Sequence, residues 1–128
     1  MIIHIKNKGI FWDENTDSEK ERVDVSAGED WHNFVISSLN KKFYGLENLA
    51  LIPGTVGGAP IQNIGAYGVE LASVFKSCRA LNLKTLEEEV IFKKDCEFSY
   101  RSSIFKNHQK GKYIIISVCF QLKKPPHH

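Results

Sequence analysis

PGTVGGAPIQNIGAYGVE, residues 53–70, is the stretch that most restricts the fold of this 128-residue chain. It belongs to a longer segment, residues 45–68, that holds six glycines, two prolines and a single charged residue, Glu47. A solvated linker of this length would be polar, and the glycines and prolines interrupt any single regular element. The segment therefore predicts a folded loop whose backbone lies close to another part of the molecule or to a ligand.

The residues before this segment predict first strands and then a helix. Apolar residues alternate with polar ones near the N-terminus and again further on, at Ile3, Ile5, Val23 and Val25. This alternation predicts an antiparallel meander within residues 1–27. Apolar residues then recur at helical spacing, at Trp31, Phe34, Val35 and Leu39. We expect an amphipathic helix over residues 29–40, with Trp31 in the core and the acidic Glu29 and Asp30 in its first turn.

The residues after the segment are mostly strand-like. Residues 73–83, 88–92 and 113–122 have the composition of strands, and the loop 94–111 precedes the last of them. A second helix starting near Gly58 would direct its positive end toward the glycines. Strands grouped together with two helical segments predict an α+β fold, an antiparallel sheet with flanking helices.

Composition excludes several classes of function. Seventeen Lys and Arg against 15 Asp and Glu leave a formal charge of +2, too balanced to predict a nucleic-acid or membrane partner. The most apolar stretch, Tyr113–Leu122, is too short to span a membrane, and the first residues lack the apolar core of a signal peptide. We expect a cytoplasmic protein.

The cysteines and histidines do not predict a metal site. The 3 cysteines, Cys78, Cys96 and Cys119, are an odd number without CxxC spacing, which favours buried free thiols over disulfides or zinc ligands. The histidines are either isolated, at His4, His32 and His108, or close the chain as His127 and His128. Residues 125–128 read equally well as native sequence or as the start of a purification tag.

Two features of residues 53–68 have chemical meaning. The glycines of PGTVGGAP, residues 53–60, would let backbone N–H groups converge on a phosphate or another electron-rich group. The stretch is neither a Walker loop nor a GxGxxG fingerprint, and a tight turn packed against a strand explains it as well. In NIGAYG, residues 63–68, Asn63 is available to bond backbone or ligand, and Tyr67 would lie against a flat ring or fill the core.

A third chemical feature is FSYRSSIFK, residues 98–106. Arg101 stands in it among aromatic and hydroxyl side chains. A planar guanidinium there could bind a carboxylate in bidentate fashion and keep its charge at any working pH. An ordinary surface ion pair with the nearby Glu97 is an equal alternative.

Together, PGTVGGAPIQNIGAYGVE and FSYRSSIFK resemble the UDP-N-acetylenolpyruvoylglucosamine reductases, the MurB family of bacterial peptidoglycan synthesis. AGEDWHNFV and GLENLALIPG upstream are similar to the same family, so the resemblance runs over nearly the whole chain. It implies an oxidoreductase that takes hydride from NADPH onto FAD and passes it to a UDP-sugar, in a pathway that supports cell shape and division. It also implies the second subdomain of an FAD-binding domain of the PCMH or vanillyl-alcohol-oxidase type.

The resemblance assigns roles to individual residues. Arg101 matches the catalytic arginine, which would hold the substrate carboxylate and stabilise the charge that develops after hydride transfer. Tyr100, Ser103 and Lys106 would support the substrate, while Ser102 stands where many members have Asp. The flavin contacts implied by the resemblance are Ile52, Pro53, Gly57, Gly58, Ile61, Gly65, Ala66 and Tyr67, with Ile115 near the adenine end.

The resemblance covers only part of a reductase. The flavin-diphosphate loop GxGSN, a serine proton donor and a glutamate of such enzymes have no counterpart here, so residues 1–124 are expected to form a partial FAD-binding domain that is inactive alone. Apolar surface around residues 56–67 and beside Arg101 would then be exposed and favour self-association. Two alternatives remain: a flavin-binding module of another FAD-linked oxidoreductase, and a non-catalytic structural module.

Overall fold

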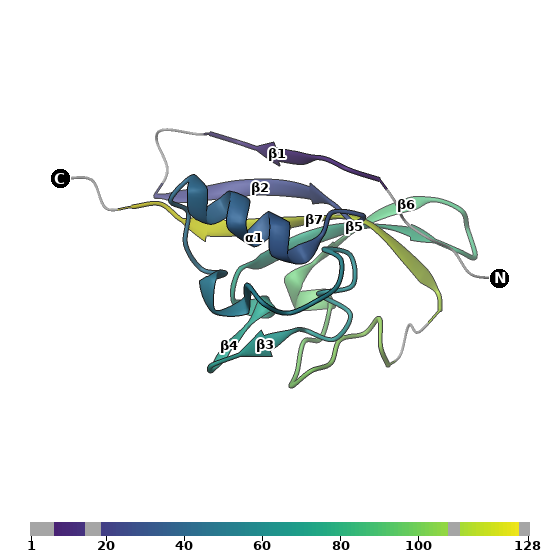
Figure 1. Cartoon of the computed structure of the whole chain (residues 1–128). Coiled ribbons are helices and arrows are strands. Elements are labelled where there is room, and N and C mark those ends of the chain that lie inside the picture. Colours follow the sequence, from purple (N-terminus) through teal and green to yellow (C-terminus); the bar gives the residue numbers. More distant parts are fainter. Residues whose placement is uncertain (1–6, 15–18, 108–110, 126–128) are drawn as a thin grey trace.

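A five-stranded antiparallel sheet is the centre of the molecule (Figure 1). The structure, a computed structural model, describes residues 7–14, 19–107 and 111–125. Strand order in the sheet is β1-β2-β7-β5-β6, so the last strand in sequence lies in the middle. The strands are β1 (Ile10–Trp12), β2 (Lys20–Ser26), β5 (Phe75–Asn82), β6 (Glu88–Phe92) and β7 (Tyr113–Lys123).

The sheet register follows the alternation of apolar residues. Val23 and Val25 of β2 are fully buried and lie opposite Phe120 and Val118 of β7. On the other side of β7, Val118 is paired with Cys78 of β5. Because side chains alternate along a strand, these residues all face the same side of the sheet. That side is the core.

Helix α1 (Trp31–Asn40) covers this core face, in front of β2 and β7 (Figure 1). Asp30 caps its N-terminus, where the carboxylate accepts a hydrogen bond from Asn33 N at 2.9 Å. The buried residues are Trp31, Phe34, Val35 and Ser38, a spacing that puts them on one face of the helix. The Phe34 ring stacks on Phe120 of β7 at 5.3 Å between centroids, so this contact joins α1 to the sheet.

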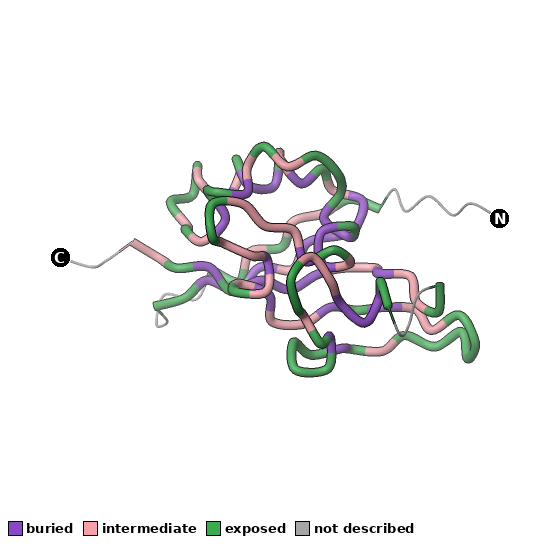
Figure 2. The backbone as a smooth tube through the Cα atoms, turned by 90° about the horizontal axis from the view of Figure 1, so that it is seen from below, coloured by how far each residue is buried: buried purple, intermediate pink, exposed green. Residues whose placement is uncertain are grey.

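Shorter elements lie beside the helix and below the sheet. They are the single-turn 3₁₀ segments η1 (Glu47–Leu49), η2 (Leu71–Ser73) and η3 (Lys93–Asp95), and a two-stranded hairpin of β3 (Gly65–Ala66) and β4 (Val69–Glu70). Seen from below in Figure 2, the buried stretches run along the interior, and the loops at the periphery are exposed.

The predicted α+β fold with an antiparallel sheet is confirmed, with two corrections. No helix begins near Gly58, because residues 56–63 form successive turns. Glu29 precedes α1 rather than joining its first turn, and its carboxylate accepts from Gly9 N at 3.0 Å. Strand β1 lies within the meander expected over residues 1–27, although no alternation was singled out there, and Ile3 and Ile5 lie outside the described residues.

Candidate functional site

The first part of the glycine segment lies against the chain between β2 and α1. Val56 N donates to Glu29 O at 2.9 Å, and Gly57 N donates to Ala27 O at 3.0 Å. A Cβ built on Gly57 would lie 2.7 Å from the Ala27 Cβ, closer than real carbon atoms approach. Gly57 is therefore required by packing against the end of β2, as the tight-turn alternative proposed.

This packing predicts opposite outcomes at two adjacent glycines. Gly57→Ala should destabilise the fold by about 1–3 kcal/mol, because the new methyl group overpacks against the Ala27 backbone. Gly58→Ala should change stability by less than about 0.5 kcal/mol, because its Cβ would meet Thr55 Oγ1 at 3.4 Å and Thr55 O at 3.6 Å, both ordinary contacts. Urea denaturation of the two variants measures the difference. Equal midpoints would contradict the packing role given to Gly57.

A pocket of about 350 Å³ opens beside this segment. Its lining is uncharged and consists of Trp31, Ile52, Pro53, Gly54, Thr55, Gly58, Ala59, Gln62 and Ile64. Ile52, Pro53 and Gly58 are three of the residues for which the sequence predicts flavin contacts. The volume lies at the lower end of the range for ligand pockets, and an uncharged wall with small residues suits one face of a flat ring.

The second part of the segment forms the β3–β4 hairpin. Its two-residue turn is Tyr67-Gly68, with φ of 53° and 77°. Positive φ at both central residues is the conformation that a type I′ turn requires. The Tyr67 side chain is not part of the core, because the residue is 88% exposed at the hairpin tip. The alternative that Tyr67 fills the core is therefore wrong, and contact with a flat ring stays a prediction.

Arg101 stands in a second tight turn, next to the first. Ser99 and Ser102 exchange two backbone hydrogen bonds of 3.1 Å, which leaves Tyr100 and Arg101 at the tip. Arg101 has φ of 52°, a left-handed conformation that is unfavourable for a residue with a Cβ. A strained residue at a turn where glycine would fit better points to a function for its side chain.

The guanidinium of Arg101 lies across the base of the β3–β4 hairpin. Its Nη2 donates to Gly65 O at 2.9 Å, and its Nη1 lies 3.9 Å from Glu70 Oε2. A Cβ on Gly65 would be 2.8 Å from Val69 O and even closer to Arg101 Nη1. The absence of a side chain at Gly65 therefore creates the space in which the guanidinium lies. Arg101 therefore contacts the second part of the glycine segment, at Gly65.

Asn63 joins the parts of this site. The residue is 1% exposed, and its Nδ2 donates to Glu70 Oε2 at 2.7 Å and to Ser99 O at 3.0 Å. Its Oδ1 accepts from Ala72 N at 2.9 Å. One buried amide thus connects the glycine segment, the end of β4 and the turn that carries Arg101.

The supporting residues predicted around Arg101 occupy different environments. Ser103 is 1% exposed and its hydroxyl donates to Ile61 O at 2.7 Å, which fastens the arginine loop to the glycine segment. Lys106 donates to Arg101 O at 3.2 Å. The Tyr100 ring is exposed, and the Arg101 guanidinium lies 4.7 Å from its centroid. These contacts stiffen the loop, which holds Arg101 in place.

Two other predicted flavin contacts are placed differently from the pocket residues. Ala66 is half-buried in β3, beside Gly65. Ile115 lies on β7 opposite Ala80, and its side chain is buried in the core. Of the predicted flavin contacts, the structure therefore places Ile52, Pro53 and Gly58 at the pocket and Gly65 and Ala66 in the hairpin that Arg101 contacts, whereas Gly57 and Ile115 are buried.

The ion-pair alternative for Arg101 is correct in kind but not in partner, and the partner was not among the predicted site residues. The ion pair is with Glu70, not Glu97. Glu70 is the only charged residue between Asn48 and Phe75, a signal that could have identified it. A charge that interrupts such an apolar stretch needs a partner, because an unpaired charge there would be costly.

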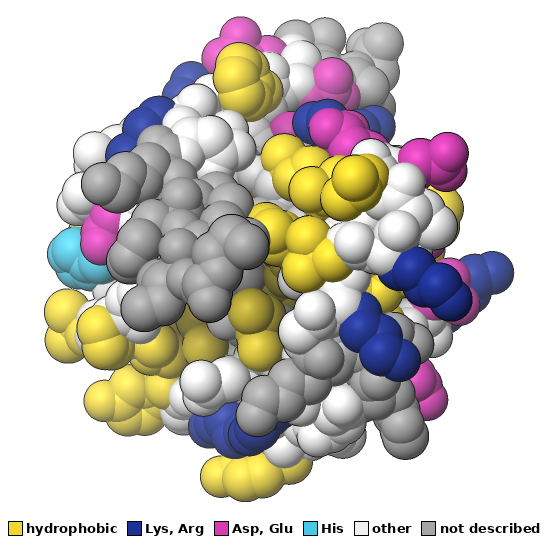
Figure 3. All heavy atoms as spheres, turned by 90° about the vertical axis from the view of Figure 1, so that its right-hand side faces the viewer, with side chains coloured by type: hydrophobic (Ala, Val, Ile, Leu, Met, Phe, Trp, Pro, Cys, Tyr) yellow, Lys and Arg dark blue, Asp and Glu magenta, His cyan; other side chains and the backbone are white. Residues whose placement is uncertain are grey.

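The expected exposure of residues 56–67 is only partly correct. Val56 and Ala59 are buried. Exposed apolar side chains near the site come instead from Leu51, Tyr67 and Tyr100. On the face drawn in Figure 3, hydrophobic side chains gather toward the lower left and the bottom, beside basic ones. Self-association through such surface stays a prediction.

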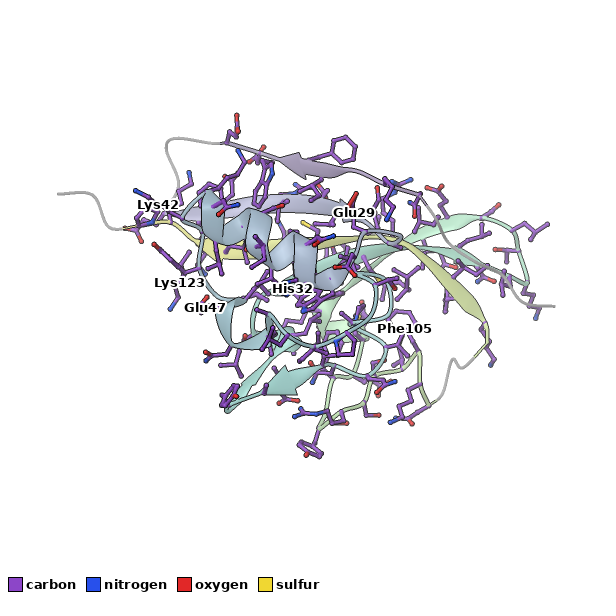
Figure 4. The ribbon with its side chains drawn as sticks, viewed as in Figure 1. Glu29, His32, Lys42, Glu47, Phe105 and Lys123 are labelled. Atoms are coloured by element: carbon purple, nitrogen blue, oxygen red, sulfur yellow. The ribbon has the colours of Figure 1, made fainter. Side chains whose placement is uncertain are left out.

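The thiols and histidines of the described residues offer no reactive or metal-binding cluster. All 3 cysteines are free and buried, as predicted. The pKa of Cys78 is raised, first by its hydrogen bond to Cys96 and then by burial. The pKa of Cys119 is raised too, first by burial and then by the nearby Asp24. Both thiols stay protonated at neutral pH. His32 on α1 hydrogen-bonds Ala50 O just after η1 (Figure 4), while the other histidines lie outside the described residues.

Comparison with known proteins assigns the chain to a family. The sequence model of the FAD binding domain family matches residues 2–91. The chain belongs to this FAD binding domain family. Among solved structures it is similar to the crystal structure of UDP-N-acetylenolpyruvylglucosamine reductase (MurB) from Thermus caldophilus, with a TM-score of 0.71 and 28% sequence identity. The match covers 80% of this chain and 36% of that chain. The fold of this FAD binding domain is therefore that of the corresponding part of the reductase.

Curated relatives of this FAD binding domain carry the same name. The protein called UDP-N-acetylenolpyruvoylglucosamine reductase in Flavobacterium johnsoniae is 46% identical to this chain, and the match covers 99% of this chain and 37% of that protein. In Neisseria meningitidis serogroup C the identity is 46% over 96% of this chain and 35% of the relative. The chain thus spans about a third of the length of these relatives. Among the described residues no helix has both the length and the apolar character to cross a membrane.

Proposed function

We propose that this chain is the flavin-lining part of a reductase that uses NADPH and FAD to convert UDP-N-acetylglucosamine enolpyruvate to UDP-N-acetylmuramate in cytoplasmic peptidoglycan synthesis. The observation that carries the proposal is the shared name of relatives that are 46% identical over 96–99% of the chain. The geometry supports it, because the strained Arg101 donates a hydrogen bond to Gly65 O of the glycine segment.

The residues of the glycine segment fit a flavin. The pocket beside Gly58 is uncharged, and the glycine adds no side chain that would block a planar ring. Ile52, Pro53 and Gly58 would hold one part of FAD, with Gly65, Ala66 and Tyr67 further along the same segment. The flavin, when bound, would supply the hydride.

Arg101 would act on the substrate. Its guanidinium carries a permanent charge and is held at Gly65 O, so it is oriented before a substrate arrives. It would bind the enolpyruvyl carboxylate and stabilise the negative charge that grows there as hydride is added. Ser103 and Lys106 would keep the turn in place through their bonds to Ile61 O and Arg101 O.

Titration of FAD with the chain tests the cofactor part of this proposal. Adding the chain should quench flavin fluorescence with an affinity in the micromolar range. Gly58→Leu should weaken this binding by about tenfold or more, because the larger side chain would occupy the pocket. The matched control is Gln121→Leu, at an exposed position of β7, which should bind FAD as the unchanged chain does. Quenching that is absent, or equal in both variants, would contradict the assignment.

A further inference from the structure

Glu70 stands at the centre of the candidate site, although no role has been assigned to it. It ends β4 and is paired in register with Gly65 of β3, whose carbonyl oxygen accepts from Arg101. Its carboxylate therefore lies beside the same hairpin base that the guanidinium crosses. The side chains of Arg101 and Glu70 are 36% and 41% exposed, so neither is isolated from solvent.

The Glu70 carboxylate is held in place by Asn63 as well as by the arginine. Oε2 accepts a 2.7 Å hydrogen bond from Asn63 Nδ2, and Asn63 is buried and fixed by its bonds to Ala72 N and Ser99 O. The same Oε2 is the atom 3.9 Å from Arg101 Nη1. Asn63 thus sets both where the carboxylate lies and, through Ser99, where the arginine turn begins.

Two anchors then define the orientation of the guanidinium. Gly65 O binds Nη2, and Glu70 attracts Nη1. The Tyr100 ring, 4.7 Å from the guanidinium, limits its tilt, and a contact on the other nitrogen further restricts its rotation about the hydrogen bond to Gly65 O.

From these contacts we infer that Glu70 is a positioning residue, which orients the Arg101 guanidinium for an anionic carboxylate without touching the substrate itself. The inference rests on the proposed function, since it gives the orientation of Arg101 a purpose. Its effect is modest in size, because a half-exposed ion pair contributes about 1 kcal/mol at most, which corresponds to about fivefold in rate.

The chain offers a matched control for the test. Arg79 and Glu88 form another arginine–glutamate pair, on β5 and β6, with both side chains about half exposed. Glu88→Gln removes the same charge as Glu70→Gln and loosens a different arginine. The control therefore separates the loss of a carboxylate in general from its loss at the site.

The first measurement follows the arginine signals of the chain by NMR. The Nε–Hε signal of Arg101, identified by its absence in Arg101→Lys, should shift and broaden in Glu70→Gln as rotation becomes easier. Glu88→Gln should change the Arg79 signal and leave that of Arg101 in place. An Arg101 signal that is the same in Glu70→Gln and the unchanged chain would overturn the inference, whatever the protein's reaction is.

The second measurement uses a polypeptide that carries this chain together with the further segments of its relatives. Glu70→Gln should lower kcat about fivefold, with KM changed by less, but should have no further effect when Arg101 is already alanine. An equal loss in both backgrounds would show a merely structural role and overturn the inference. Normal turnover by Arg101→Ala would instead contradict the proposed function and leave the NMR result intact.

Discussion

Arg101→Ala should lower kcat by about 100–1000-fold in a polypeptide that joins this chain to the further segments of its relatives. The reason is that the guanidinium is the one preorganised cation that the described residues place over the β3–β4 hairpin. Alanine at φ of 52° carries about the same backbone strain as arginine, so the substitution removes the guanidinium without relaxing the turn. Steady-state kinetics with UDP-N-acetylglucosamine enolpyruvate measures the effect.

Flavin binding should survive this substitution, because the pocket beside Gly58 lies outside the contacts of Arg101. Arg101→Lys should recover only part of the rate, since a lysine keeps the charge but cannot reach Gly65 O and Glu70 with separate nitrogens. Arg79→Ala is the control for loss of an exposed arginine on the sheet, and should turn over normally. Turnover by Arg101→Ala equal to that of Arg79→Ala would contradict the catalytic role.

Asn63→Ala should destabilise the chain by about 3–5 kcal/mol, a large part of the stability of an ordinary domain. Ala72 N would lose its acceptor, while Ser99 O and Glu70 would each lose a donor, because the buried Asn63 amide serves all three. A further cost is conformational. Asn63 has φ of 44°, which asparagine tolerates better than alanine does. Denaturant unfolding followed by circular dichroism measures the loss.

Asn63→Gly separates the two contributions. Glycine accepts the positive φ without strain, so about 1 kcal/mol should be recovered, while the loss of the three hydrogen bonds remains. If alanine and glycine are equally destabilising, the backbone conformation is of no consequence. If glycine restores full stability, the amide does not join the three segments as the structure indicates.

Periodic features of the sequence predicted most of the fold. Helix α1 followed from the spacing of Trp31, Phe34 and Val35, and β7 from a continuous apolar run. Strand β1 has only three residues, too few for alternation to be recognised. The helix expected near Gly58 does not form because Gly57 and its neighbours bond to the chain before α1, a tertiary contact without a local pattern.

The sequence predicted which residue types form the candidate site, but not which residues contact one another there. Arg101 was singled out because its guanidinium stands among aromatic and hydroxyl residues. Its neighbour in sequence, Glu97, seemed a suitable counter-ion. The actual partner, Glu70, is 31 positions away and is brought there by the register of β3 with β4 and by the Asn63 amide. No local pattern encodes such a contact.

The central position of β7 has a consequence for synthesis. Strand β7 lies between β2 and β5 and pairs with both. These two strands therefore cannot join into one sheet until residues 113–123 have been synthesised. A growing polypeptide would thus leave the ribosome with the inner faces of β2 and α1 uncovered until that last strand emerges. Closing the sheet over such a separation in sequence is slow, so nascent chains would depend on chaperones for longer than a protein that folds from neighbouring hairpins.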